Sequence, residues 1–179
     1  SSPSRGLGDV YKRQALLGKT INPKTEQKEA AGYGLIPLGL GAKLGLARFN
    51  FEFRMVPEGK FEFGYFDRSY EIERATFELG PDNRGNIITK SKKLGLYGPQ
   101  NGFYSSLLLN LGSLFDAKMA FQSLTGEMYN EQKGVFEDSD NQSFTSIVKL
   151  KKSISKIETA NWFYQQRNVP NPFDFEYSE

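Results

Sequence analysis

Apolar and polar side chains alternate along most of the chain from residue 35 onward, and this period of two predicts β-strands with two different faces. Between Leu38 and Leu46 the apolar positions are even-numbered, and the residues between them are glycine or lysine. In the next stretch, from Arg48 to Met55, the apolar positions are odd-numbered. A slip of one residue would move the apolar set to the other face of the sheet. We therefore predict a hairpin turn near Gly45 to Arg48.

The alternation continues beyond the turn signal Pro57-Glu58-Gly59, where residues 60–65 predict a third strand. Five more strands are expected at 75–79, 103–111, 116–124, 144–150 and 157–166. The later connections are expected to be alternately long and short, at 80–101, 112–115, 126–142 and 152–156. The sequence thus predicts an all-β fold, an antiparallel up-and-down meander of about eight strands.

This alternation fits two classes of protein. A soluble sheet turns its apolar face inward and its polar face to water, whereas a membrane barrel turns its apolar face to lipid and its polar face to a wet lumen. Long and short connections alternate in outer-membrane barrels, and charged residues such as Arg48 and Glu52 recur in mid-strand here. Both features favour a barrel. The alternative is a soluble periplasmic or secreted all-β binding domain.

The two hypotheses place the same apolar residues differently. In a barrel these residues form an outward band, whereas in a soluble domain they converge in a dry interior with Arg48, Glu52 and Arg54 outside. The residues that separate the hypotheses are Phe49, Phe51, Phe53, Met55, Phe61, Phe63, Met119 and Phe121.

Three stretches, Ile36 to Lys43, Phe61 to Tyr70 and Asn168 to Asp174, resemble bacterial outer-membrane β-barrels, in particular porin-like proteins known from environmental genomes. The resemblance covers most of the chain from Leu35 and implies a curved, incomplete transmembrane β-barrel in a bacterial outer membrane. It implies passive transport or a structural role in the envelope, with the lipid bilayer as partner. Such barrels finish on a strand with a terminal aromatic residue, whereas this chain stops at Tyr177-Ser178-Glu179, so we expect a fragment.

The N-terminal residues show a resemblance of another kind. Ser4 to Gln14 look like a forward translation of the transposon-end adapter used in tagmentation sequencing. We therefore expect three parts: a non-native adapter-derived tail at 1–14, a loop or linker at 15–31 and a partial β-barrel domain at 32–179. The authentic N-terminus, with any signal peptide, would then be missing.

The tail also accounts for the charge of the chain. Residues 1–14 contain three basic residues, Arg5, Lys12 and Arg13, and one acidic residue, Asp9, so the net charge of the tail is +2. This equals the formal net charge of all 179 residues. The remainder is balanced, so the sequence predicts no nucleic-acid partner. No apolar run approaches the ~18 residues that a transmembrane helix needs.

Candidate functional residues fall into two groups. If residues 48–55 and 60–65 form adjacent strands, a lumen face would carry Arg48, Asn50, Glu52, Arg54, Lys60 and Glu62. A denser mixed-charge stretch, predicted to be a charged loop or a pore constriction, comprises Asp67, Arg68, Glu71, Glu73 and Arg74.

Enzymatic chemistry is not expected. The chain has no Cys and no His, which excludes thiol nucleophiles, imidazole bases and Cys/His zinc sites. Glu71 and Glu73 would share one strand face, but glycosidases use two carboxyl groups across a cleft. The glycines at 39, 41 and 45 match no phosphate-binding spacing, and they are expected to relieve crowding on a strand. The sequence predicts neither a cofactor nor a metal site.

Overall fold

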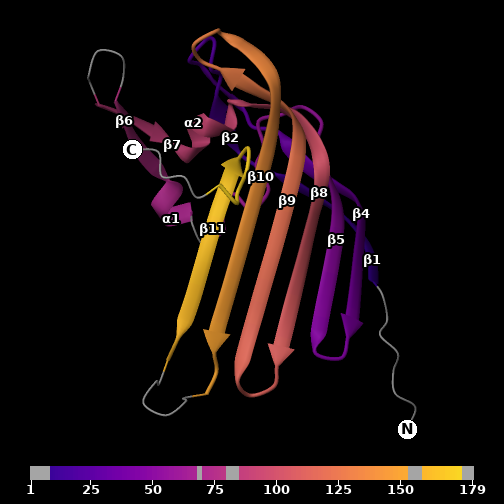
Figure 1. Ribbon diagram of the computed structural model, residues 1–179. Helices are drawn as coiled ribbons and strands as arrows, with labels where there is room; N and C mark the ends of the chain where they lie inside the picture. The colour runs from indigo at the N-terminus through magenta and orange to yellow at the C-terminus, as the bar shows by residue number, and fades with distance from the viewer. Residues whose placement is uncertain (1–8, 68–69, 80–84, 153–158, 175–179) are drawn as a thin grey trace.

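The computed structural model describes residues 9–67, 70–79, 85–152 and 159–174. Its main element is one antiparallel sheet of seven strands, whose neighbours follow chain order once two insertions are set aside (Figure 1). The fold is therefore the predicted up-and-down meander. The seven strands are β1 (Asp9–Leu16), β4 (Tyr33–Leu44), β5 (Ala47–Val56), β8 (Tyr97–Leu111), β9 (Phe115–Asn130), β10 (Val135–Leu150) and β11 (Asn161–Val169).

The sheet is curved but open. In the described part of the chain, β1 and β11 are its two edge strands, and each pairs with one neighbour. Figure 1 shows the strands bending around one side, which we call the concave face, and the other side is the convex face.

Short turns join the strands at one end of the sheet. The β4–β5 hairpin turns at Gly45 and Leu46, with Leu44 paired to Ala47. Gly45 has a φ of 57°, in the left-handed region that glycine enters without strain. The predicted hairpin is confirmed. The β8–β9 link, around Gly112, lies at the same end (Figure 1).

The predicted strand at 60–65 is wrong. After the turn at Pro57–Gly59 the chain bends back over the concave face, because Lys60 and Gly64 adopt left-handed φ values of 55° and 74°. Phe61 and Phe63 are buried there instead of lying on a sheet. Their period-two spacing reflects two rings entering one core, where they meet edge to face at 5.0 Å.

The predicted long loop at 126–142 is also wrong. Strands β9 and β10 pair without interruption, from Phe115 opposite Leu150 at one end to Asn130 opposite Val135 at the other. A tight turn at 131–134 joins the two strands. Gly134, with φ of 69°, ends that turn. Polar residues suit both faces of this hairpin because it extends beyond the rest of the sheet (Figure 1).

Two insertions lie at the end opposite the short turns. Between β1 and β4, in the segment expected to be a linker, a small hairpin pairs β2 (Lys19–Ile21) with β3 (Lys28–Ala30). Between β5 and β8 lie α1 (Tyr70–Glu73), β6 (Ala75–Leu79), β7 (Gly85–Thr89) and α2 (Lys90–Leu94), with β6 paired to β7. At four and five residues, the helices of the described chain are too short to cross a membrane.

A small core fills the concave side near these insertions. One cluster packs Phe61 and Phe63 against Ile36, Val56 and Leu124 of the sheet. A second joins Tyr65 to Ala31, Leu94 and Tyr97. The insertion therefore covers one end of the concave face and leaves the end with the short turns uncovered.

Candidate functional site

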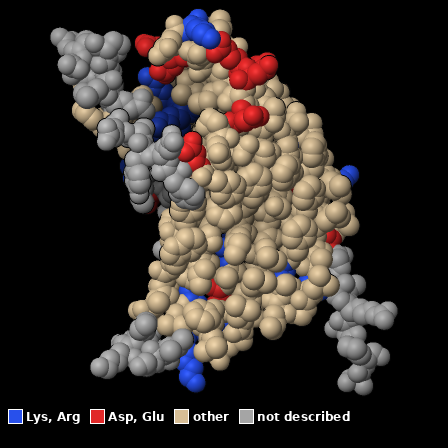
Figure 2. All heavy atoms as spheres, in the orientation of Figure 1, with Lys and Arg blue, Asp and Glu red and all other residues tan. Residues whose placement is uncertain are grey.

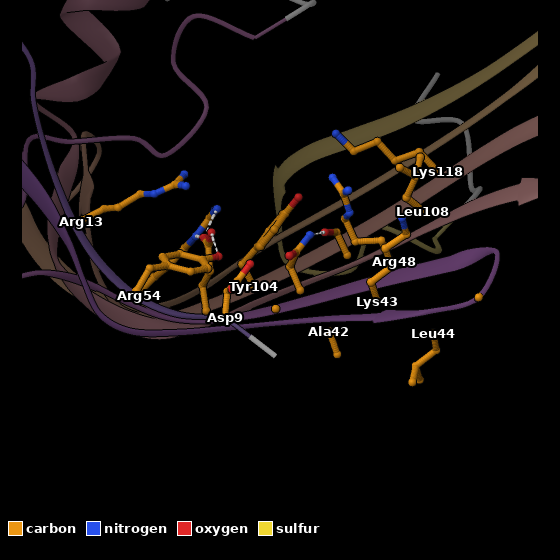
Figure 3. A pocket seen from close by; sticks show the side chains of 16 residues that line it. Asp9, Arg13, Ala42, Lys43, Leu44, Arg48, Arg54, Tyr104, Leu108 and Lys118 are labelled. Atoms are coloured by element: carbon orange, nitrogen blue, oxygen red, sulfur yellow. Dashed lines mark hydrogen bonds and ion pairs between the residues drawn. The ribbon is translucent and has the colours of Figure 1, made fainter. Parts of the chain in front are cut away.

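A polar trough runs along the uncovered part of the concave face. Its volume is about 1280 Å³, and its lining comes from β1, β4, β5, β8 and β9 (Figure 3). Cross-strand register aligns its side chains in rows, since Glu52 pairs with Tyr104 and Tyr104 with Gln122. The next row toward the short turns joins Asn50 to Ser106, whose hydroxyl accepts a hydrogen bond of 3.3 Å from Asn50 Nδ2.

Arg54 is the centre of a buried network in this trough. Its Nε and Nη2 donate to Glu52 Oε2 at 2.8 and 2.6 Å, and Nη1 donates to Gln122 Oε1. Tyr11 donates to the other oxygen of Glu52 at 2.7 Å. Only 14% of the Arg54 side chain and 8% of the Glu52 side chain are exposed. A buried ion pair of this kind is satisfied by hydrogen bonds and is expensive to break.

Two aromatic rings lie close to the same guanidinium. The Cζ of Arg54 lies 3.9 Å from the ring centroid of Tyr104 and 4.6 Å from that of Phe63. Tyr104 belongs to the sheet, whereas Phe63 belongs to the segment folded over it. Cation–π contacts of a desolvated arginine contribute about 2 kcal/mol, so Arg54 couples the sheet to the covering segment.

A second ionic cluster ties the covering segment to the edge strand β11. Arg167 Nη2 donates to Glu62 Oε1 at 2.6 Å, and Nη1 donates to Asp67 Oδ1 at 2.7 Å. Asn168 Nδ2 also donates to Glu62 Oε1 at 2.6 Å. Glu62 is buried with Lys90, whose Nζ lies 4.0 Å from Glu62 Oε2. The segment therefore spans the concave face from β5 to β11.

The residues predicted to face a lumen divide into two sets. Arg48, Asn50, Glu52 and Arg54 share the concave face and line the trough. Lys60 and Glu62 do not lie on a neighbouring strand, because the chain leaves the sheet after Val56. Lys60 pairs instead with Glu29 at 2.9 Å, and Glu62 enters the buried cluster around Arg167.

The predicted charged loop does not come together as one group. Asp67 lines a smaller pocket that adjoins the trough at Arg54, and it accepts a hydrogen bond of 3.1 Å from Gln165 Nε2. Glu71 and Arg74 form an exposed pair at 3.9 Å beside α1. Arg68 and the side chain of Glu73 lie outside the described residues.

Several polar residues of the concave face carry no motif in the sequence. Lys118 and Gln122 of β9 and Arg167 of β11 are polar members of alternating strands, so their face was readable from the pattern. The partners of Arg167 could not be predicted from the sequence, because Glu62 and Asp67 reach β11 only where the chain bends inward over the concave face.

The convex face has the opposite character. Phe49, Phe53 and Met119 are 43%, 38% and 42% exposed, whereas Glu52 on the other side is 6% exposed. Phe51 and Phe121 share this outward face by register. Figure 2 shows a broad surface without Lys, Arg, Asp or Glu over the middle of β8–β10, and acidic residues gathered at the hairpin end.

Phe61 and Phe63 were expected in the same outward band, but both are buried on the concave side. Among the described residues, no group of three or more acidic side chains has the geometry of a metal site.

No protein-family model, curated protein or solved structure matches this chain.

Proposed function

We propose that this chain forms part of the wall of a bacterial outer-membrane β-barrel, in which the convex face contacts lipid and the concave face lines a passage for water and solutes. The observation that carries the proposal is the inversion of polarity across the sheet. Phe49 and Phe53 of β5 are exposed on one side, and the ion pair of Glu52 and Arg54 is largely buried on the other.

The height of the apolar surface supports this function. Its convex-face positions run from Ala47 to Met55 in β5 and from Phe103 to Leu111 in β8. This is about nine residues, close to the nine to eleven of a tilted strand that crosses a bilayer. Above this apolar band, β9 and β10 carry Glu127, Asp138 and Asp140 on the convex side, as expected where strands leave the membrane.

The open edges are consistent with a wall that further strands complete. Edge strands expose backbone N–H and C=O groups, and no such group is left unpaired in a bilayer. In this proposal, β4 and β11 are the edges that pair with further strands of the wall, and β1, whose residues are expected to be adapter-derived, occupies the place of one such strand beside β4. The covering segment, held by Arg167, narrows the passage at the end away from the short turns.

Tryptophan fluorescence tests the proposal directly, because Trp162 is the single tryptophan. In a Trp162→Phe background, Leu107→Trp and Leu108→Trp place one indole on each face at nearly the same height. After reconstitution in phosphatidylcholine vesicles, brominated lipid should quench Leu107→Trp strongly and Leu108→Trp weakly. Aqueous iodide should give the reverse order.

Equal quenching of the two variants by brominated lipid would contradict a lipid-facing convex surface. A chain that does not partition into vesicles and stays folded in buffer would instead support the soluble all-β binding domain. Far-UV circular dichroism of each variant separates these outcomes from loss of fold.

A further inference from the structure

Three cations gather at the end of the trough near the short turns. They are Lys43 of β4, Arg48 of β5 and Lys118 of β9. Figure 3 shows all three on the concave side of the strands, whereas Ala42 and Leu44 point away from it. Lys43 lies directly opposite Arg48 in the β4–β5 register, and Leu108 is the cross-strand partner of both Arg48 and Lys118.

These cations lack the acidic partners that other cations of the concave face have. Arg54 pairs with Glu52 and Arg167 with Glu62, but no ion pair joins Lys43, Arg48 or Lys118 to a described carboxylate.

The two carboxylates of this region, Asp116 and Asp9, do not neutralise the positive charge of the three cations. Asp116 pairs with Lys151 at 2.9 Å, and Asp9 lines the trough without an ion pair to the three cations. Like charges directly opposite each other destabilise a sheet, and an anion bound between them would relieve this repulsion.

We infer that Lys43, Arg48 and Lys118 form a binding site for soluble multivalent anions that carry phosphate, sulfate or carboxylate groups. Leu108 and Ile147 lie beside Lys118 in the register, so neither cross-strand neighbour of Lys118 is a carboxylate. The trough exceeds the roughly 300–1,000 Å³ of typical ligand pockets, so the site selects by charge more than by shape.

The site faces dissolved anions and not lipid headgroups, because it lies on the side of the sheet opposite the apolar band. Anion binding does not depend on the proposed function. Only its consequence, that the passage prefers anions, rests on the proposed barrel. Binding itself needs no membrane, so the two proposals can fail separately.

The test uses the full chain in a non-ionic detergent, with 1,3,6,8-pyrenetetrasulfonate as the probe and fluorescence anisotropy at low ionic strength as the readout. Each of Lys43→Gln, Arg48→Gln and Lys118→Gln should weaken binding about two- to fivefold, and the triple variant at least about tenfold. The control is Lys28→Gln in β3, which removes an exposed charge far from the trough and should change binding by less than about twofold.

An equal effect of Lys28→Gln, or unchanged binding by the triple variant, would overturn the site. Phosphatidylglycerol added to the micelles should not displace the probe, and displacement would assign the cations to lipid headgroups instead. If the triple variant loses its circular dichroism signal, the single variants decide, since each removes one exposed charge.

Discussion

Arg167 and Glu62, 105 residues apart in the sequence, form a buried ion pair of 2.6 Å that joins the edge strand β11 to the segment folded over the concave face. Their side chains are 8% and 5% exposed. Asp67 and Asn168 complete the cluster around them. This contact ties the covering segment to β11, and the core contacts of Phe61 and Phe63 tie it to the middle of the sheet.

Removing the arginine should therefore destabilise the protein strongly. Arg167→Met leaves Glu62 buried with Asn168 and Lys90, and we expect a loss of about 3 kcal/mol in the free energy of unfolding. Urea unfolding in detergent, followed by Trp162 fluorescence, measures the change. Arg74→Met is the control, because its ion pair with Glu71 is exposed and should contribute less than about 0.5 kcal/mol. Similar losses in the two variants would show that the cluster does not anchor the segment.

A double-mutant cycle should show strong coupling between Glu52 and Arg54. Arg54→Met leaves the Glu52 carboxylate with Tyr11 as its remaining hydrogen-bond donor, and we expect a loss of about 3 kcal/mol. The double variant Glu52→Gln with Arg54→Met removes the unpaired charge, so it should be more stable than Arg54→Met alone. Additive losses in the cycle would mean that the two side chains act independently.

The strands and their two faces were predictable from the alternation, because a period of two assigns every second residue to one face. Arg48, Asn50, Glu52 and Arg54 were placed on one face in this way, and the β4–β5 turn followed from the phase slip at Gly45. These features depend on local geometry alone.

The covering segment was not predictable from the same pattern. Phe61 and Phe63 alternate with polar residues as a strand does, but the left-handed conformation of Lys60 turns them into the core. Arg167, which holds this segment, has its partners about 100 residues away. Such contacts depend on how the whole sheet curves, and neighbouring residues do not determine that.

Two turn glycines should respond differently to a methyl group. Gly45 and Gly59 both have left-handed φ values, but a Cβ at Gly45 meets open space, whereas one at Gly59 meets the backbone of Tyr97 and Gly98. Gly45→Ala should lower the free energy of unfolding by about 1 kcal/mol, and Gly59→Ala by about 3 kcal/mol. Urea unfolding of the two variants tests this difference. Equal losses would show that the covering segment moves aside without a penalty.

The hairpin end that projects above the apolar band contains a charge that depends on pH. Hydrogen bonds from Lys133 and Asn130 lower the pKa of the exposed Glu137 carboxyl. Because its folded pKa lies below the unfolded one, the contribution to stability is present at neutral pH and is lost as the pH falls through the folded value. Lys133→Gln should raise the Glu137 pKa in a carbon-13 NMR titration. An unchanged pKa in this variant would assign the effect to Asn130.

The adapter-like tail makes a prediction about the gene. Asp9–Gln14 pair with β4, and the Tyr11 ring occupies the space left open at Gly39. A chance segment with alternating residues can pair in this way at an open edge, since edge strands accept any extended chain. The same gene from a library prepared without that adapter should match from codon 15 onward and differ before it. Finding the same fourteen codons there would show that β1 is native, and that Tyr11 belongs to the Glu52 network.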